Sequence, residues 1–187
     1  LLENGGPFNI QLSGGEPTLR EDLAEIIKLG KNLGFDFFQL NTNGIKLAEN
    51  IDFCLELKEA GLNCVFLQFD GLKDTTYVKL RGKNLIDIKM KAIDNCKQAG
   101  IAVVLVPTIV SGINDNEIGT ILDFALSNLP YVKGVHFQPA SYFGRYPFEF
   151  LGNRLTMPEL IDLIDIQTEG KMPVSAFIPP ASEHPLC

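Results

Sequence analysis

Residues 85–106 read LIDIKMKAIDNCKQAGIAVVLV, and this stretch decides the fold class. Its first part carries apolar residues at steps of three and four, the spacing of one helix face: Leu85, Ile88, Ala92 and Cys96. Gly100 then ends the helix, and the apolar run Ile101–Val106 follows without a polar residue. Such a continuous run is typical of a strand inside a parallel sheet that is covered on both faces.

The same alternation of apolar runs and helical patterns extends outward to both ends of the chain. Further strands are predicted at Phe8–Leu12, Phe35–Leu40, Cys64–Phe69, Val135–Gln138 and Val174–Ile178. Helices are predicted between them, one of which ends at Gly61. Three others start with capping signals: Thr18-x-x-Glu21, Asn114-x-x-Glu117 and Thr156-x-x-Glu159.

This βα repeat predicts a parallel α/β fold, either an open doubly wound sheet or a complete or partial barrel. The pattern alone does not choose between them. We expect one domain over residues 1–187, with barrel units in about 1–150 and the last helix and a proline-rich tail in 151–187. A start at Leu1 without methionine and an end at Cys187 indicate a piece of a longer protein.

The overall charge is acidic, since 16 Lys and Arg stand against 23 Asp and Glu for a formal net charge of −7. Such a chain repels nucleic-acid phosphates and anionic lipid, so neither is expected as a partner. No apolar run approaches the roughly 20 residues that span a bilayer, and residues 1–7 lack the features of a signal peptide. We therefore expect a cytoplasmic protein.

The four cysteines lie far apart and form no C-x-x-C pair. Cys54, Cys64 and Cys96 fall in apolar patterns, so we expect them to be buried as small hydrophobic side chains, whereas the role of Cys187 is open. The two histidines are too few for a histidine-rich metal site or a Ser-His-Asp triad.

Polar residues follow each predicted strand, at the edge where parallel α/β folds bind ligands. They are Ser13–Pro17, Asn41–Gly44, Gln68–Gly71, Pro107-Thr108 with Ser111–Asp115, and Gln138–Ser141. Taken singly, each cluster is explained by turn formation. The pair Gly14-Gly15 followed by Glu16 is harder to explain in this way, because it puts bare backbone beside a fixed negative charge. That combination favours an amine-bearing ligand over a phosphate.

The segment Leu12–Leu19, LSGGEPTL, closely resembles the GGEP segment after the second strand of radical S-adenosylmethionine (SAM) enzymes. Further matches follow in the family's order at Asn41–Gly44, Asp70-Gly71, Leu80–Gly82, Pro107–Val110 and Gly112–Asp115. The resemblance implies a partial parallel (β/α)6 TIM-like barrel that lacks its first βα unit. That unit, with the C-x-x-x-C-x-x-C loop that binds the cluster, would precede Leu1.

In this family, three cysteines hold a [4Fe–4S] cluster, and SAM binds its fourth iron through amino and carboxylate groups. An electron, from a donor such as ferredoxin or flavodoxin, splits SAM, and the 5′-deoxyadenosyl radical abstracts hydrogen from a substrate. The resemblance therefore implies these cofactors and a small-molecule or lipid-like substrate. Without the cysteine loop, we expect residues 1–187 alone to hold neither cofactor and to be inactive.

The resemblance also implies a set of SAM-binding residues: Gly14, Gly15, Glu16, Asn43, Gln68, Asp70, Arg81, Thr108, Asn114 and Gln138. The first three match the segment that receives the SAM amino group. Arg81 is a candidate partner of the SAM carboxylate or a surface side chain. Asn114 is a candidate ribose contact or a helix cap, and Gln138 would face adenine or substrate.

A finer resemblance links His136–Arg145 and the tail Pro180–Cys187 to the pterin methyltransferase-like and tetraether lipid synthase-like branch. The tail of that branch carries a Cys-Ser-His-Pro-x-Cys pattern. This chain has Ala181 in place of the first cysteine and an inserted Glu183, so an auxiliary metal site at Cys187 is left open.

Two other functions are compatible with the residue pattern. An ordinary βα-barrel or flavodoxin-like enzyme would bind a phosphorylated metabolite, although only Arg20 supplies a basic residue near the glycine pair. A non-catalytic binding or assembly module is suggested by the mean hydropathy of +0.11. An open sheet edge explains this apolarity as well, and such an edge favours a dimer.

Overall fold

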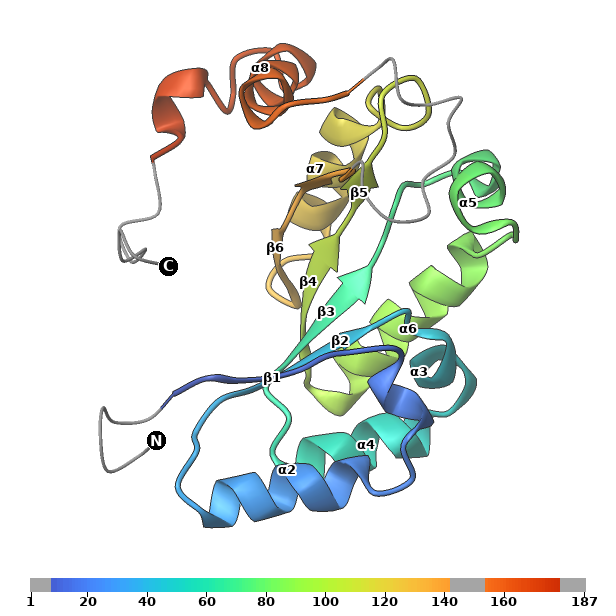
Figure 1. Ribbon diagram of the computed structural model, residues 1–187, viewed down its shortest axis with the longest axis vertical. Helices are drawn as coiled ribbons and strands as arrows, with labels where there is room; N and C mark the ends of the chain where they lie inside the picture. Colours follow the sequence, from blue (N-terminus) through green and yellow to red (C-terminus); the bar gives the residue numbers. More distant parts are fainter. Residues whose placement is uncertain (1–7, 142–153, 179–187) are drawn as a thin grey trace.

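The computed structural model describes residues 8–141 and 154–178, which form a parallel sheet with helices packed along it (Figure 1). Five strands pair in chain order: β1 (Ile10–Leu12), β2 (Phe38–Thr42), β3 (Cys64–Gln68), β4 (Ala102–Val106) and β6 (Val132–Val135). A separate parallel pair joins β5 (Thr108–Ile109) to β7 (Gln138–Pro139). The predicted parallel α/β class is confirmed.

The strand order decides between the two predicted architectures. Each strand of the five-stranded sheet is added beside the one before it, without the reversal of a doubly wound sheet. Right-handed crossovers then place the connecting helices on one face, and the sheet curves around its other face. The described part of the chain is therefore built as a partial barrel.

Seven α-helices lie between the strands or follow them in the described part of the chain. They are α2 (Leu23–Asn32), α3 (Ile45–Glu49), α4 (Ile51–Ala60), α5 (Asp74–Arg81), α6 (Ile86–Ala99), α7 (Ile118–Ser127) and α8 (Met157–Gln167). Gly61 and Gly100 end α4 and α6 as predicted, in the left-handed conformation at φ +111° and +70°. None of the helices that the structure describes has the length and apolar character needed to cross a membrane.

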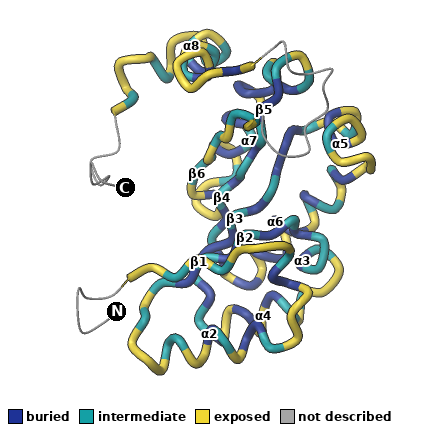
Figure 2. Tube along the Cα trace, in the orientation of Figure 1, coloured by how far each residue is buried: buried dark blue, intermediate teal, exposed yellow. Residues whose placement is uncertain are grey.

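The main core lies between the sheet and its helices, because alternate strand residues point to that side (Figure 2). In β4, Val103 and Leu105 are fully buried there, whereas Ala102, Val104 and Val106 are half-buried on the opposite face. The prediction that this strand is covered on both faces is therefore wrong. The inner face of a partial barrel stays open to a ligand.

Of three further sequence predictions, one is confirmed and two are wrong. The Thr18 hydroxyl donates to Glu16 instead of capping a helix, and Pro17–Leu19 forms a 3-10 turn before α2. Thr156 does form the predicted capping box with Glu159 at the start of α8. The sixth predicted strand is wrong, because Val174–Ala176 is a 3-10 turn and Phe177 packs against the α7–α8 core.

Candidate functional site

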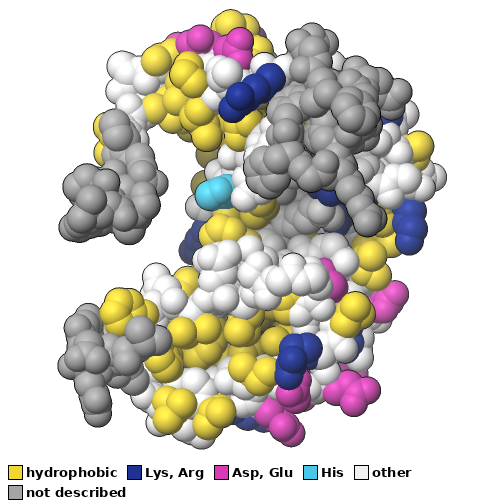
Figure 3. Space-filling model, in the orientation of Figure 1, with side chains coloured by type: hydrophobic (Ala, Val, Ile, Leu, Met, Phe, Trp, Pro, Cys, Tyr) yellow, Lys and Arg dark blue, Asp and Glu magenta, His cyan; other side chains and the backbone are white. Residues whose placement is uncertain are grey.

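The carboxyl ends of the strands surround a polar cavity of about 380 Å³, which we name the rim cavity; the molecule is hollowed on the face shown in Figure 3. Seven of the ten predicted site residues line it: Gly14, Gly15, Glu16, Asn43, Gln68, Thr108 and Gln138. The prediction missed Phe66, which is paired with Asn41 in the β2–β3 register and also lines the cavity. Asn41 lines the cavity as well, and it belongs to the predicted polar edge but not to the predicted SAM-binding set. Side chains alternate between the two faces of a strand, so counting back in steps of two from a polar residue at the strand end would have predicted residues on the cavity face.

The backbone of the glycine pair is open to the rim cavity. A Cβ added to Gly14 or Gly15 would meet no heavy atom within 4 Å, and Gly14 has φ +131°, which side chains rarely allow. A ligand can therefore approach this backbone closely.

Glu16 uses its carboxylate to hold the neighbouring loop. It accepts hydrogen bonds from the Thr18 hydroxyl at 2.7 Å, the Thr42 hydroxyl at 2.6 Å and the Asn43 N–H at 2.7 Å. These contacts tie the turn after β1 to the end of β2. Glu16 thus supplies negative charge at the cavity wall and also fixes the shape of that wall.

The loop after β2 is tightly packed. Gly44 has φ +81°, and a Cβ there would lie 2.4 Å from Leu67 Cδ1, so this position requires glycine. The Asn43 side chain accepts from the Ile45 N–H at 2.9 Å, at the start of α3. Asn43 therefore shapes the loop through its backbone and its side chain together.

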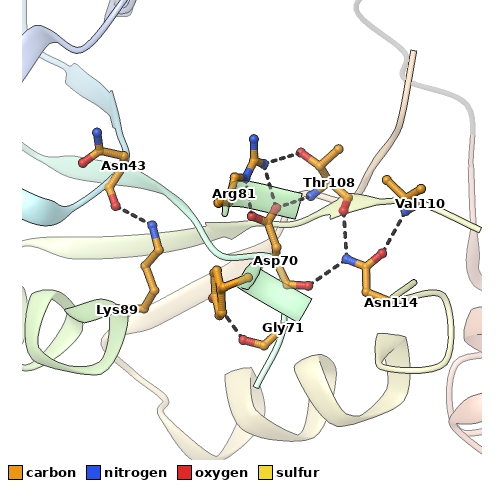
Figure 4. Close-up of polar contacts among 9 residues, drawn as sticks. Asn43, Asp70, Gly71, Arg81, Lys89, Thr108, Val110 and Asn114 are labelled. Atoms are coloured by element: carbon orange, nitrogen blue, oxygen red, sulfur yellow. Dashed lines mark hydrogen bonds and ion pairs between the residues drawn. The ribbon is translucent and has the colours of Figure 1, made fainter. Parts of the chain in front are cut away.

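Asp70 and Arg81 form a bidentate ion pair (Figure 4). The Arg81 Nε and Nη2 atoms donate to the carboxylate at 2.8 and 3.0 Å, and the Thr108 N–H donates at 3.1 Å. With the Gln68 amide oriented so that its oxygen faces Arg81, which is the orientation that matches donors to acceptors, this oxygen accepts from Nη1 at 3.2 Å and from Nη2 at 3.0 Å. Asp70 is fully buried, so it organises cavity residues without lining the cavity itself.

Asn114 completes this network and is also fully buried. Its amide donates to the carbonyls of Asp70 at 2.8 Å and Thr108 at 2.9 Å, and its oxygen accepts from the Val110 N–H at 2.8 Å. The alternative that Asn114 caps a helix is wrong, because α7 begins only at Ile118. Asp70, Arg81 and Asn114 are thus the three predicted residues outside the cavity lining.

Lys89 and Glu117 are two buried polar residues for which the sequence suggested no site role. Lys89 donates from α6 to the Asn43 carbonyl, and Glu117 accepts from the Leu72 N–H and the Thr76 hydroxyl. A signal for Lys89 exists in the sequence, because it lies four residues after Leu85 and three before Ala92, on the apolar face of α6.

A second cavity, which we name the side cavity, shares Thr108 and Gln138 with the rim cavity. Its remaining lining residues are His136, Phe137, Pro139, Ala140, Ser141 and Met157. The His136 ring lies 6.2 Å from the Phe66 ring, centroid to centroid. The two cavities together therefore form one continuous polar and aromatic surface.

The described cysteines do not form a metal site. Cys54, Cys64 and Cys96 are buried as predicted, and burial raises the pKa of the Cys64 thiol to about 11. Within residues 8–141 and 154–178, no group of three metal-binding side chains comes together. Cys187, residues 142–145 and the tail from 180 onward, which carried the finer resemblance, lie outside the described residues.

Known proteins match this chain in sequence over most of its length. A family model described as the Radical SAM superfamily matches residues 1–125. The chain is 49% identical over 179 residues to the 7,8-dihydro-6-hydroxymethylpterin dimethyltransferase of Methanocaldococcus jannaschii, covering 95% of this chain and 35% of that relative. It is 33% identical over 138 residues to the GTP 3′,8-cyclase of Nautilia profundicola, covering 73% of this chain and 42% of that relative.

Solved structures share the fold. A domain of pyruvate-formate lyase-activating enzyme from Bacteroides vulgatus has a TM-score of 0.67 at 15% identity, covering 88% of this chain and 96% of that domain. The chain spans less than half the length of the two curated relatives above, at 35% and 42%.

Proposed function

The chain belongs to the radical SAM superfamily, and we propose that in the whole protein its rim cavity binds SAM for radical chemistry on a small molecule. The observation that carries this proposal is the open Gly14-Gly15 backbone at the wall of a cavity lined by amides and hydroxyls. A volume of about 380 Å³ falls within the range of small-molecule sites.

The residues around the rim cavity fit the chemical groups of SAM. We assign the SAM amino group to the Gly14-Gly15 backbone, where the Glu16 carboxylate adds negative charge. The Asn43 and Thr108 side chains offer hydrogen-bond partners for ribose hydroxyls. Arg81 is already paired with Asp70, so we assign it to holding Gln68 in place.

The described residues do not fit a [4Fe–4S] cluster, because their three cysteines are buried in the core and lie far apart along the chain. We propose that the cluster ligands belong to a part of the whole protein outside residues 1–187. In this family, SAM beside the cluster supplies the radical that removes hydrogen from the substrate. The residues of this chain bind SAM, orient it and shape the wall that faces the substrate.

We propose a pterin-like heterocycle as the substrate, since one relative is named for a pterin substrate. The side cavity supports this choice, because it adjoins the rim cavity and offers the aromatic rings of His136 and Phe137. A phosphorylated metabolite fits this site less well as a ligand, because its phosphate needs a basic partner. Arg20, the basic residue near the glycine pair, is exposed and already paired with Asp22.

The test compares two glycine variants of the whole protein. Gly14 and Gly82 both have positive φ and open space around an added Cβ, but only Gly14 lines the rim cavity. After anaerobic reconstitution with iron and sulfide, we expect about four irons per chain and 5′-deoxyadenosine in the wild type. Gly14→Ala should weaken SAM binding at least about tenfold, whereas Gly82→Ala should not. Residues 1–187 alone should produce no 5′-deoxyadenosine.

A wild type that takes up no iron and leaves SAM intact would overturn the proposal. Equal effects of the two glycine variants on SAM binding would show that SAM does not use the glycine pair.

A further inference from the structure

Lys89 lies in α6 with its side chain fully buried, and its ammonium points toward the Asn43 backbone (Figure 4). Its Nζ atom donates a hydrogen bond of 2.5 Å to the backbone carbonyl of Asn43 and lies 5.9 Å from the centroid of the Tyr77 ring. Among the described residues, no carboxylate is within salt-bridge distance of it. Burying an ammonium without a direct counterion is costly, so packing alone does not explain this lysine.

The charged groups around Lys89 come from the strand ends and from α5. Asp70 after β3 and Glu16 after β1 favour the ammonium, whereas Arg81 of α5 opposes it. Burial is the largest influence and lowers the pKa of Lys89 to about 8. The side chain therefore carries its charge at neutral pH and loses it in mildly alkaline solution.

Asn43 is held from both sides by charged groups. Its N–H donates to the Glu16 carboxylate at 2.7 Å, and its carbonyl accepts from the Lys89 ammonium at 2.5 Å. Hydrogen bonds to charged groups are about twice as strong as neutral ones. The peptide groups on both sides of Asn43 cannot turn without breaking one of them. The part of the cavity wall formed by residues 41–43 is therefore set before a ligand arrives.

We propose that Lys89 is a positioning residue of the SAM site, whose ammonium fixes the Asn43 carbonyl from behind and keeps residues 41–44 in their ligand-binding shape. The inference rests on the proposed function for the identity of the ligand. The holding of the loop by Lys89 is independent of that identity. While Lys89 itself stays buried, loss of the ammonium charge weakens its hydrogen bond to Asn43, so the loop opens more readily as pH rises through about 8. Unfolding of the whole chain takes Lys89 into water and therefore has the opposite pH dependence.

The experiment measures SAM affinity and amide hydrogen exchange in the whole protein for the wild type, Lys89→Met and Lys91→Met. Lys91 is exposed on the same helix and serves as the control. Lys89→Met should weaken SAM binding about tenfold, which corresponds to losing one charged hydrogen bond. It should also lower the protection factors of the Asn43, Gly44 and Ile45 amides without SAM. Lys91→Met should match the wild type in both measurements.

The pH profile separates positioning from bulk packing. In the wild type, the protection of the 43–45 amides should fall between pH 7 and pH 9.5, across the pKa of about 8, and in Lys89→Met it should stay flat. If Lys89→Met does not fold, the pH dependence of amide protection in the wild type alone tests the proposal. Protection of the 43–45 amides that does not change with pH would overturn it. Unchanged SAM affinity and protection in a folded Lys89→Met also overturn it. If the wild type binds no SAM, the proposed function fails, while the exchange data still test the role of Lys89.

Discussion

At the scale of single residues, the buried Lys89 gives folding stability a pH dependence of its own. Its pKa is about 8 in the folded protein and 10.5 in the unfolded chain, so the unfolded chain binds more protons between these values. Stability contributed by this group therefore rises with pH across that window. Lowering the pKa of Lys89 from 10.5 to about 8 corresponds to roughly 3 kcal/mol at most.

Urea unfolding of the wild type and Lys89→Met at pH 7 and pH 10.5 measures this pH dependence of stability. All other titrating groups are present in both proteins, so their contributions cancel in the difference between the two free energies of unfolding. We expect the wild type to gain stability relative to Lys89→Met as pH rises through 8 to 10.5. A constant difference between the two proteins would mean that Lys89 keeps an ordinary pKa and that its ammonium is not desolvated.

At the scale of elements, α6 anchors the segment that follows β2 at a second point. The Asn95 amide is buried and donates to the carbonyls of Leu47 at 2.7 Å and Ala48 at 3.2 Å, in the last turn of α3. A helix of five residues is too short to be stable by itself, so α3 depends on these bonds. Lys89 and Asn95 together fix both ends of residues 43–48 to one helix.

We expect Asn95→Ala to destabilise the protein by about 1–3 kcal/mol, because the carbonyls at the end of α3 lose a buried donor. The matched control is Gln98→Ala, which changes an exposed residue of the same helix and should leave stability unchanged. Denaturant unfolding of both variants provides the measurement. If the two variants are equally stable, α3 is held by apolar packing and not by Asn95.

At the scale of the whole molecule, β1 is an outer strand of the five-stranded sheet, with a neighbour on one side only among the residues that the structure describes. The Ile10 N–H donates to Phe37, so the next N–H along the strand, that of Gln11, points away from the sheet. An unpaired strand edge is a template for another chain. We therefore predict that residues 1–187 alone dimerise through β1.

Sedimentation velocity over a range of concentrations measures this association. Gln11→Pro removes the outward N–H without taking a donor from the β1–β2 pair, so it should shift the chain toward the monomer. A wild-type chain that stays monomeric at every concentration, or a Gln11→Pro variant that associates equally well, would contradict the prediction.

Much of the fold and of the site was predictable from the sequence, because the signals for it are local. The helices that end at Gly61 and Gly100 were recognised from apolar spacing followed by glycine, over about a dozen residues each. The LSGGEPTL segment indicated the family from eight consecutive residues, and the matching family model supports it. Seven predicted site residues line the rim cavity, because parallel strands end at a common edge.

Only the tertiary structure decided the strand order and the partners of the buried polar groups. The apolar pattern left a partial barrel and a doubly wound sheet open, the resemblance of LSGGEPTL implied the barrel, and the consecutive strand order agrees with the barrel. Glu16 and Asn43 are 27 positions apart, Asp70 and Asn114 are 44, and Asn43 and Lys89 are 46. Local pattern determines which residues end a strand. The hydrogen-bond partner of a polar side chain depends on which strand ends and helices the folded sheet brings together.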